Sequence, residues 1–177
     1  MTYTETPTDT IPQWTPRGVA NGEAFQAQTI SFRQDHFPDW RLSISDRKYD
    51  AVVGIAIERS IHKDVQSIYI DLPGEPTAGR VFERAMSYGG GIFQIKPSPS
   101  ANSTTSWNTS IAYYIEITNW DKGLSSGTTC NSMQAKTGSA SGRLYISFQG
   151  SELSLENSWV SGVFEDAPIV YCPAGEN

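Results

Sequence analysis

The side chains best suited to acid–base chemistry are two histidines that each have an aspartate nearby. His36 follows Asp35, and His62 stands two residues before Asp64. A histidine that acts as a general base also needs a nucleophile within hydrogen-bond reach. No G-x-S-x-G nucleophile elbow accompanies either histidine in its own segment. We therefore interpret both histidines as solvated turn residues and predict that the protein is not an enzyme.

Paired carboxylates could hydrolyse glycosidic bonds if they faced each other at the required separation. The candidate pairs are Asp71 with Glu75, Glu116 with Asp121, and Glu165 with Asp166. Such pairs arise by chance among 19 acidic residues, so they do not change the prediction. Oxygen atoms around Asn119 could bind calcium, but the chain has no EF-hand pattern. We predict neither a metal nor a cofactor.

Aromatic side chains in polar surroundings offer a better indication of binding. Trp107 and Trp120 lie among threonine, serine, asparagine and aspartate residues, in segments that we interpret as exposed loops. An exposed indole flanked by such residues can stack on a sugar ring or anchor a protein interface. The alternative is that each indole folds back over the end of the domain. The candidate ligand-binding residues are Trp107, Tyr114, Trp120 and Asp121.

The two cysteines, Cys130 and Cys172, favour a disulfide over a zinc site, because the chain has no CxxC or Cys/His cluster. Both stand in polar segments flanked by glycine or proline. A bridge between them would stabilise the fold by roughly 4 kcal/mol and would imply an oxidising compartment. Two reduced core cysteines are the alternative.

Composition narrows the possible partners. The net charge is −6, and no cluster of lysine and arginine is present, so nucleic-acid binding is not expected. No run approaches the roughly 20 apolar residues that a membrane-spanning helix needs. Charged residues make up only 18% of the chain. The uncharged polar remainder is typical of extracellular, periplasmic, cell-surface or virion proteins.

The elements that must position these side chains are predicted to be strands. Apolar and polar residues alternate in several segments, as expected for strands with one wet face. The expected strands are 24–32, 40–45, 51–58, 66–72, 91–95, 111–118 and a closing pair within 141–171. Segment 80–88 suits a helix nearly as well as a strand, and 96–109 and 119–139 are expected to be loops. About eight to ten strands predict an antiparallel β-sandwich, with a closed β-barrel as the alternative.

Residues 1–16 are rich in threonine and proline, and we expect an extended arm ahead of a single domain, 17–177. Ile11 and Trp14 are the candidate anchors of this arm. They would pack on a neighbouring subunit or on an edge of the arm's own sheet.

The closing segment reads S-G-x-L-x-I at 141–146 and V-S-G-x-F at 160–164. This pattern resembles the last hairpin of bacterial lipoprotein-type β-sandwich families of unknown function. The resemblance covers about thirty residues and implies a cell-envelope protein, although the lipobox cysteine of such proteins is not found near residue 1.

Taken together, these features predict a non-catalytic envelope, secreted or virion protein that assembles with itself or with another such protein. In this hypothesis the N-terminal arm engages a neighbouring subunit. The alternative is a carbohydrate-binding module that uses the loop tryptophans and Tyr114.

Overall fold

The structure is a computed structural model of the 177-residue chain. It describes residues 11–20, 23–36, 39–47, 65–96, 105–123, 136–149 and 158–171. These residues form nine strands, in agreement with the predicted all-β class. The strands are β1 (Arg17–Ala20), β2 (Glu23–Gln26), β3 (Thr29–His36), β4 (Asp39–Ser45), β5 (Val65–Leu72), β6 (Val81–Lys96), β7 (Thr105–Asp121), β8 (Lys136–Phe148) and β9 (Ser158–Tyr171).

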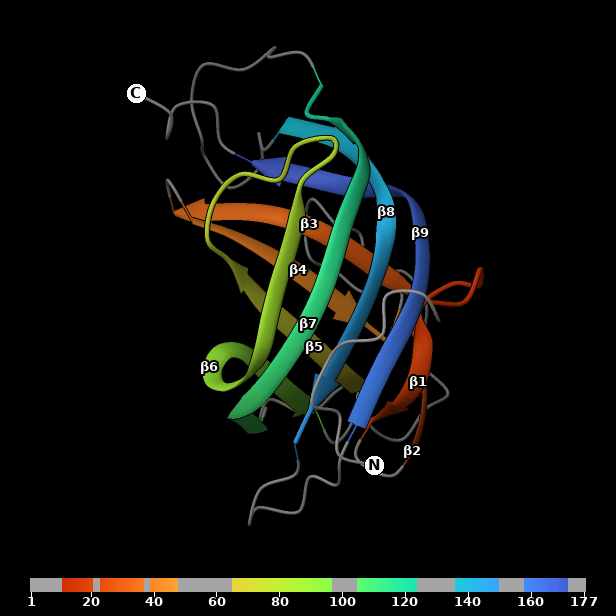
Figure 1. The fold of residues 1–177 in the computed structure, drawn as a ribbon, viewed down its shortest axis with the longest axis vertical. Coiled ribbons are helices and arrows are strands. Elements are labelled where there is room, and N and C mark those ends of the chain that lie inside the picture. Colours follow the sequence, from red (N-terminus) through yellow and green to blue (C-terminus); the bar gives the residue numbers. More distant parts are fainter. Residues whose placement is uncertain are drawn as a thin grey trace.

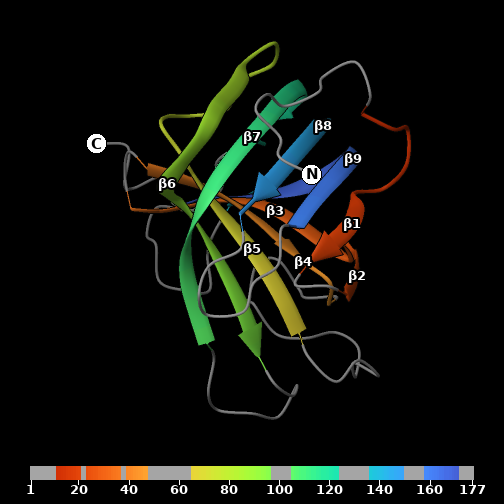
Figure 2. The same cartoon turned by 60° about the horizontal axis from the view of Figure 1, so that its bottom comes forward.

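Seven of the strands form a closed barrel in the order β9-β3-β4-β5-β6-β7-β8, because β9 pairs with both β3 and β8 (Figure 1). All neighbouring pairs in this ring are antiparallel except β3 and β9, which run parallel. β1 and β2 form a hairpin that is attached to the first half of β9, outside the ring (Figure 2). Among the residues described, no helix is long and apolar enough to cross a membrane.

The predicted sandwich is therefore wrong, and the predicted alternative of a closed barrel is confirmed. Closure depends on a bend in β9, which pairs with β1 as far as Ser161 and with β3 from Ile169. Between these two parts, Glu165 and Asp166 stand opposite the single residue Ser141 of β8. Asp166 has a φ of 53°. Such a bulge bends its strand, and the alternation of side chains along β9 cannot reveal where the bent end will pair.

The barrel interior holds the inward-facing residues of each strand. Along β4 the buried side chains of Trp40, Leu42 and Ile44 alternate with the more exposed Arg41 and Ser43. The same period of two continues in β5 and β7. Burial of each large aliphatic side chain contributes about 1.5–3 kcal/mol, so these inward faces stabilise the barrel.

The expected loops around β6 and β7 are shorter than the sequence indicated. Segment 80–88, which suited a helix nearly as well, is extended from residue 81 onward as the start of β6, where Phe82 stands opposite Ile115 of β7. The polar residues from Thr105 onward are paired as well, with Thr105 opposite Ile95. Hydrogen bonds along this hairpin outweigh the weak local preference of a serine- and asparagine-rich segment. β7 continues through Asp121, and β8 begins at Lys136.

The described part of the N-terminal arm packs on its own chain. Ile11 is buried, and the indole Nε1 of Trp14 donates to the carbonyl of Ser161 at 3.2 Å. The Trp14 carbonyl accepts from the Val163 amide at 2.8 Å. Gly162 lies beneath this crossing, where an added Cβ would stand 2.4 Å from the Trp14 carbonyl oxygen. Residues 11–16 thus hold to β9 of the same molecule.

Some of the predictions concern residues outside those described. They are the remainder of the arm, the predicted strand 51–58, His62, and the two cysteines proposed to form a disulfide, Cys130 and Cys172.

Candidate functional site

The barrel wall has an opening between β5 and β6. β5 pairs with β6 from Val65 opposite Lys96 to Ile70 opposite Gly91. Before Gly91, β6 pairs with β7 at residues 81–84, 87 and 88, and no other described strand borders the second edge of this part of β6. Gly89 and Gly90, with φ values of 85° and 76°, produce the curl in β6 that is visible in Figure 1. Glycine adopts such a backbone without the steric cost that other residues incur.

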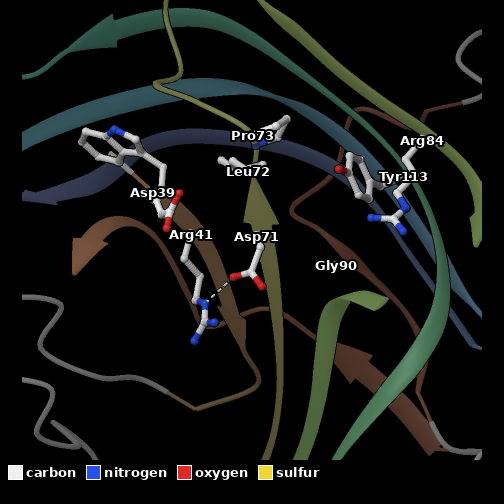
Figure 3. A pocket seen from close by; sticks show the side chains of 9 residues that line it. Asp39, Arg41, Asp71, Leu72, Pro73, Arg84, Gly90 and Tyr113 are labelled. Atoms are coloured by element: carbon white, nitrogen blue, oxygen red, sulfur yellow. Dashed lines mark hydrogen bonds and ion pairs between the residues drawn. The ribbon is translucent and has the colours of Figure 1, made fainter. Parts of the chain in front are cut away.

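A cavity of about 660 Å³ lies at this opening. It is bordered by four consecutive strands of the barrel and by the turn that follows β5 (Figure 3). The lining residues are Asp39, Trp40, Arg41, Asp71, Leu72, Pro73, Arg84, Gly90 and Tyr113.

Arg84 is held at the wall of this cavity by its own strand. Its Nε donates to Ser87 Oγ at 2.6 Å, and its Nη2 donates to the carbonyl of Tyr88 at 3.2 Å. Gly90 leaves room for the guanidinium, since a Cβ added there would stand 2.1 Å from Nη1. These contacts fix the orientation of a planar group that still has N–H donors to offer.

Tyr113 is the cross-strand partner of Arg84 on β7, and its side chain is only 4% exposed. Burial raises the pKa of its phenol, and the positive charge of Arg84 opposes that shift. Because the net effect is an increase, the hydroxyl stays protonated at neutral pH. In Figure 3 this hydroxyl and the Arg84 guanidinium lie on the same side of the cavity.

The rim on the opposite side carries an ion pair. Arg41 Nε donates to Asp71 Oδ1 at 2.9 Å, joining β4 to β5 (Figure 3). The side chains of Arg41 and Asp71 are 37% and 56% exposed, so solvent screens the pair and its contribution to stability is small. Asp39, also exposed, completes the charged rim.

Trp40 connects the cavity to an aromatic cluster inside the barrel. Its ring meets that of Trp120 edge-to-face at 5.3 Å, and Trp120 meets Phe32 in the same way at 5.5 Å. Lys122 stands over the ring of Tyr171 at 4.3 Å, at the same end of the barrel. Edge-to-face pairs stabilise the fold beyond the burial of apolar area, so these contacts hold the ring of Trp40 in place beside the cavity.

The four candidate ligand-binding residues predicted from the sequence all belong to β7, and the structure does not bring them together. Trp120, expected in a loop, is half-buried in the aromatic cluster, and its Nε1 has no hydrogen-bond partner among the residues described. Tyr114 lies on the outer face and donates to Glu116 at 3.2 Å. Asp121 is exposed and accepts from a neighbouring amide. Residue 107 belongs to β7 and stands opposite residue 93 of β6, and its side chain is outside the description.

The candidate acid–base groups are dispersed as well. Three of the predicted carboxylates form ion pairs with different cations, namely Asp71 with Arg41, Glu75 with Lys122 and Glu116 with Arg143. Glu165 and Asp166 are exposed on the bulge of β9. Residue 36 ends β3, and its side chain is not described. The described residues contain no group of three side chains able to hold a metal ion.

Among the residues that line the cavity, only Asp71 was a candidate from the sequence, as one of the paired carboxylates. Arg84 and Tyr113 are 29 positions apart and meet only through the pairing of β6 with β7. The one local signal is the glycine run at 89–91, between the predicted segments 80–88 and 91–95. The positive φ values of Gly89 and Gly90 mark a turn within a continuous strand.

Comparisons with known proteins identify no relative. The chain matches no protein-family model, no curated protein and no solved structure.

Proposed function

We propose that this protein binds a small molecule in the cavity between β5 and β6 and performs no catalysis on it. The observation that carries the proposal is the cavity itself, which opens through a gap in an otherwise hydrogen-bonded barrel wall. Side chains normally fill the interior of a barrel of this size. Here the bend at the three glycines of β6 interrupts regular pairing and leaves a space in the wall.

The size and lining of the cavity support this proposal. Its volume of about 660 Å³ falls within the range of about 300–1,000 Å³ that is typical of small-molecule sites. Trp40 and Leu72 provide buried apolar surface, while Arg84 and Tyr113 provide fixed polar groups. Apolar area with a few oriented polar groups is the usual composition of a ligand pocket.

The functions predicted from the sequence remain untested predictions. If the arm contacts a neighbouring subunit, residues 1–10 would make that contact, since residues 11–16 pack on β9 of the same molecule. Self-association, an envelope or virion partner and an extracellular location have no further support. Carbohydrate binding would use the cavity and Trp40 in place of the predicted loop residues.

The test is a titration with N-phenyl-1-naphthylamine, a neutral dye that fluoresces when it enters an apolar cavity. We expect saturable binding to the full chain, and we expect Leu72→Trp to weaken it by filling the cavity. Val81→Trp places the same indole at an exposed position of β6 and should leave binding unchanged. A dye signal that is absent, or equally affected by both variants, would overturn the proposal, provided that circular dichroism shows both variants folded.

A further inference from the structure

We infer that the ligand of this cavity carries a carboxylate, bound by the guanidinium of Arg84 and the hydroxyl of Tyr113. This inference rests on the proposed function and names the class of molecule that the site takes. Its apolar body would lie toward Trp40 and Leu72, so the class is that of monocarboxylates with a ring or chain of moderate size.

The first support is that Arg84 forms no ion pair with a carboxylate among the described side chains. The cations Arg41, Lys122 and Arg143 each form an ion pair with a carboxylate. Arg84 is half-buried at the cavity, and the described groups that contact its guanidinium, in Ser87, Tyr88 and Tyr113, carry no negative charge. A partly desolvated guanidinium without a counter-charge favours an anion from outside.

The second support is preorganisation. The hydrogen bonds to Ser87 and Tyr88 immobilise the side chain of Arg84 before any ligand arrives. Ser87 and Tyr88 lie between two register shifts of β6 against β7, one after Arg84 and one before Ile92. The strand thus departs from regular pairing at the residues that hold the guanidinium. Prior ordering lowers the entropic cost of binding.

The third support concerns the charge of the ligand. Asp39 and Asp71 stand at the rim of the same cavity, and Asp71 is already paired with Arg41. A second negative charge on the ligand would meet these carboxylates without a further free cation in the lining. The arrangement therefore favours a carboxylate over a phosphate dianion, although a guanidinium can bind either group.

The experiment measures displacement of the neutral dye by a matched pair of compounds, 1-naphthoate and 1-naphthamide. We expect the full chain to bind naphthoate more tightly than naphthamide. Arg84→Gln should weaken naphthoate by about tenfold to a hundredfold, as expected for a lost charge-assisted hydrogen bond. The affinities of the dye and of naphthamide should stay the same. Naphthyl phosphate serves as the dianion, and we expect it to bind more weakly than naphthoate.

The possible outcomes separate this inference from the proposed function. If the dye binds but naphthoate is no tighter than naphthamide, or is indifferent to Arg84→Gln, the inference is wrong and the proposed function stands. If naphthyl phosphate binds more tightly than naphthoate, the ligand class is wrong. If neither the dye nor any naphthyl compound binds, the proposed function itself fails.

Two adjacent glycines offer a control that leaves Arg84 in the sequence. Gly89→Ala and Gly90→Ala both place a Cβ on backbone with positive φ, but only the Cβ at position 90 would collide with the guanidinium. We expect Gly90→Ala to weaken naphthoate selectively. Gly89→Ala should reproduce the loss of stability without the loss of selectivity. Equal effects of the two variants on naphthoate would count against a preorganised Arg84.

Discussion

Consecutive tyrosines on β7 point to opposite faces of the barrel wall, and each meets an arginine. On the inner face, Tyr113 stands beside Arg84, which has no carboxylate partner among the described side chains. On the outer face, Tyr114 donates to Glu116, and Arg143 Nε donates to the same carboxylate oxygen at 2.5 Å. The outer cluster satisfies its own charges, whereas the inner pair leaves a cation facing a cavity.

The two tyrosines also differ in what perturbs them. Burial raises the pKa of both phenols. At Tyr113 the neighbouring Arg84 opposes that rise, while at Tyr114 the negative charge of Glu116 adds to it. The same pair of residue types thus shares a carboxylate on the outer face and has none among the described side chains on the inner face.

The largest expected difference between the two faces is in stability. Ile115, two residues beyond Tyr113 on the inner face, is fully buried. Ile115→Ala should lower the free energy of unfolding by about 2–5 kcal/mol through lost burial and the remaining cavity. Thr118→Ala on the exposed outer face should stay within about 0.5 kcal/mol. Urea denaturation measures both, and similar losses would mean that the faces of β7 are assigned wrongly.

The next difference is in ligand affinity. Tyr113→Phe should weaken naphthoate by about tenfold or more, in line with the roughly 1.5–3 kcal/mol of a hydrogen bond to a charged group. Tyr114→Phe, an identical change on the outer face, should leave naphthoate affinity unchanged. Dye displacement measures both variants. A comparable effect of the two would remove the distinction between the tyrosines.

A smaller effect is expected in the outer cluster. Glu116→Gln should destabilise the protein by about 0.2–1 kcal/mol at low salt, because the Glu116–Arg143 pair is partly exposed and screened. The loss should shrink as salt is added. Thermal unfolding at two salt concentrations tests this expectation, and a salt-independent loss would point to packing in place of charge.

The smallest effect is expected at alkaline pH. Both phenols have a pKa above the ordinary value of 10.0 in the folded chain. As pH rises past 10.0, the phenols of the unfolded chain lose their protons before those of the folded chain do. The free energy of unfolding therefore falls as pH rises from 10.0 through the raised pKa of the folded chain. Tyr113→Phe and Tyr114→Phe should each flatten this decline, with Tyr88→Phe as an exposed control. Unfolding curves at several alkaline pH values would measure it, and identical slopes would contradict the raised pKa values.

Local patterns were sufficient to predict several elements. The alternation in 40–45 and 66–72 predicted β4 and β5 to within a residue or so. The closing pair of strands was predicted for the same reason, since apolar residues such as Leu144 and Phe164 recur at every second position. Polar stretches misled the prediction at both ends of β7. Its threonine, serine and asparagine residues are extended because β6 and β8 pair with them.

The candidate site was less predictable than the strands. Trp120 has polar neighbours in the chain, yet its ring packs on Phe32 and Trp40 from other strands. No residue next to Arg84 in the sequence marks it as a binding residue. Its guanidinium is held by the carbonyl of Tyr88 and fits in the space beside Gly90. Both contacts form only when β6 curls.

Side-chain alternation alone is sufficient to predict the all-β class. It is a local property of the sequence, because successive side chains of a strand point to opposite faces of the sheet. Only the tertiary structure decided that the sheet closes into a barrel, because closure depends on the bulge at Asp166 and on the pairing of β9 with β3. The tertiary structure likewise decided that Arg84 has no carboxylate partner among the described side chains. Charge compensation is a matter of distance in space, and residues such as Glu116 and Arg143 become neighbours only through strand pairing.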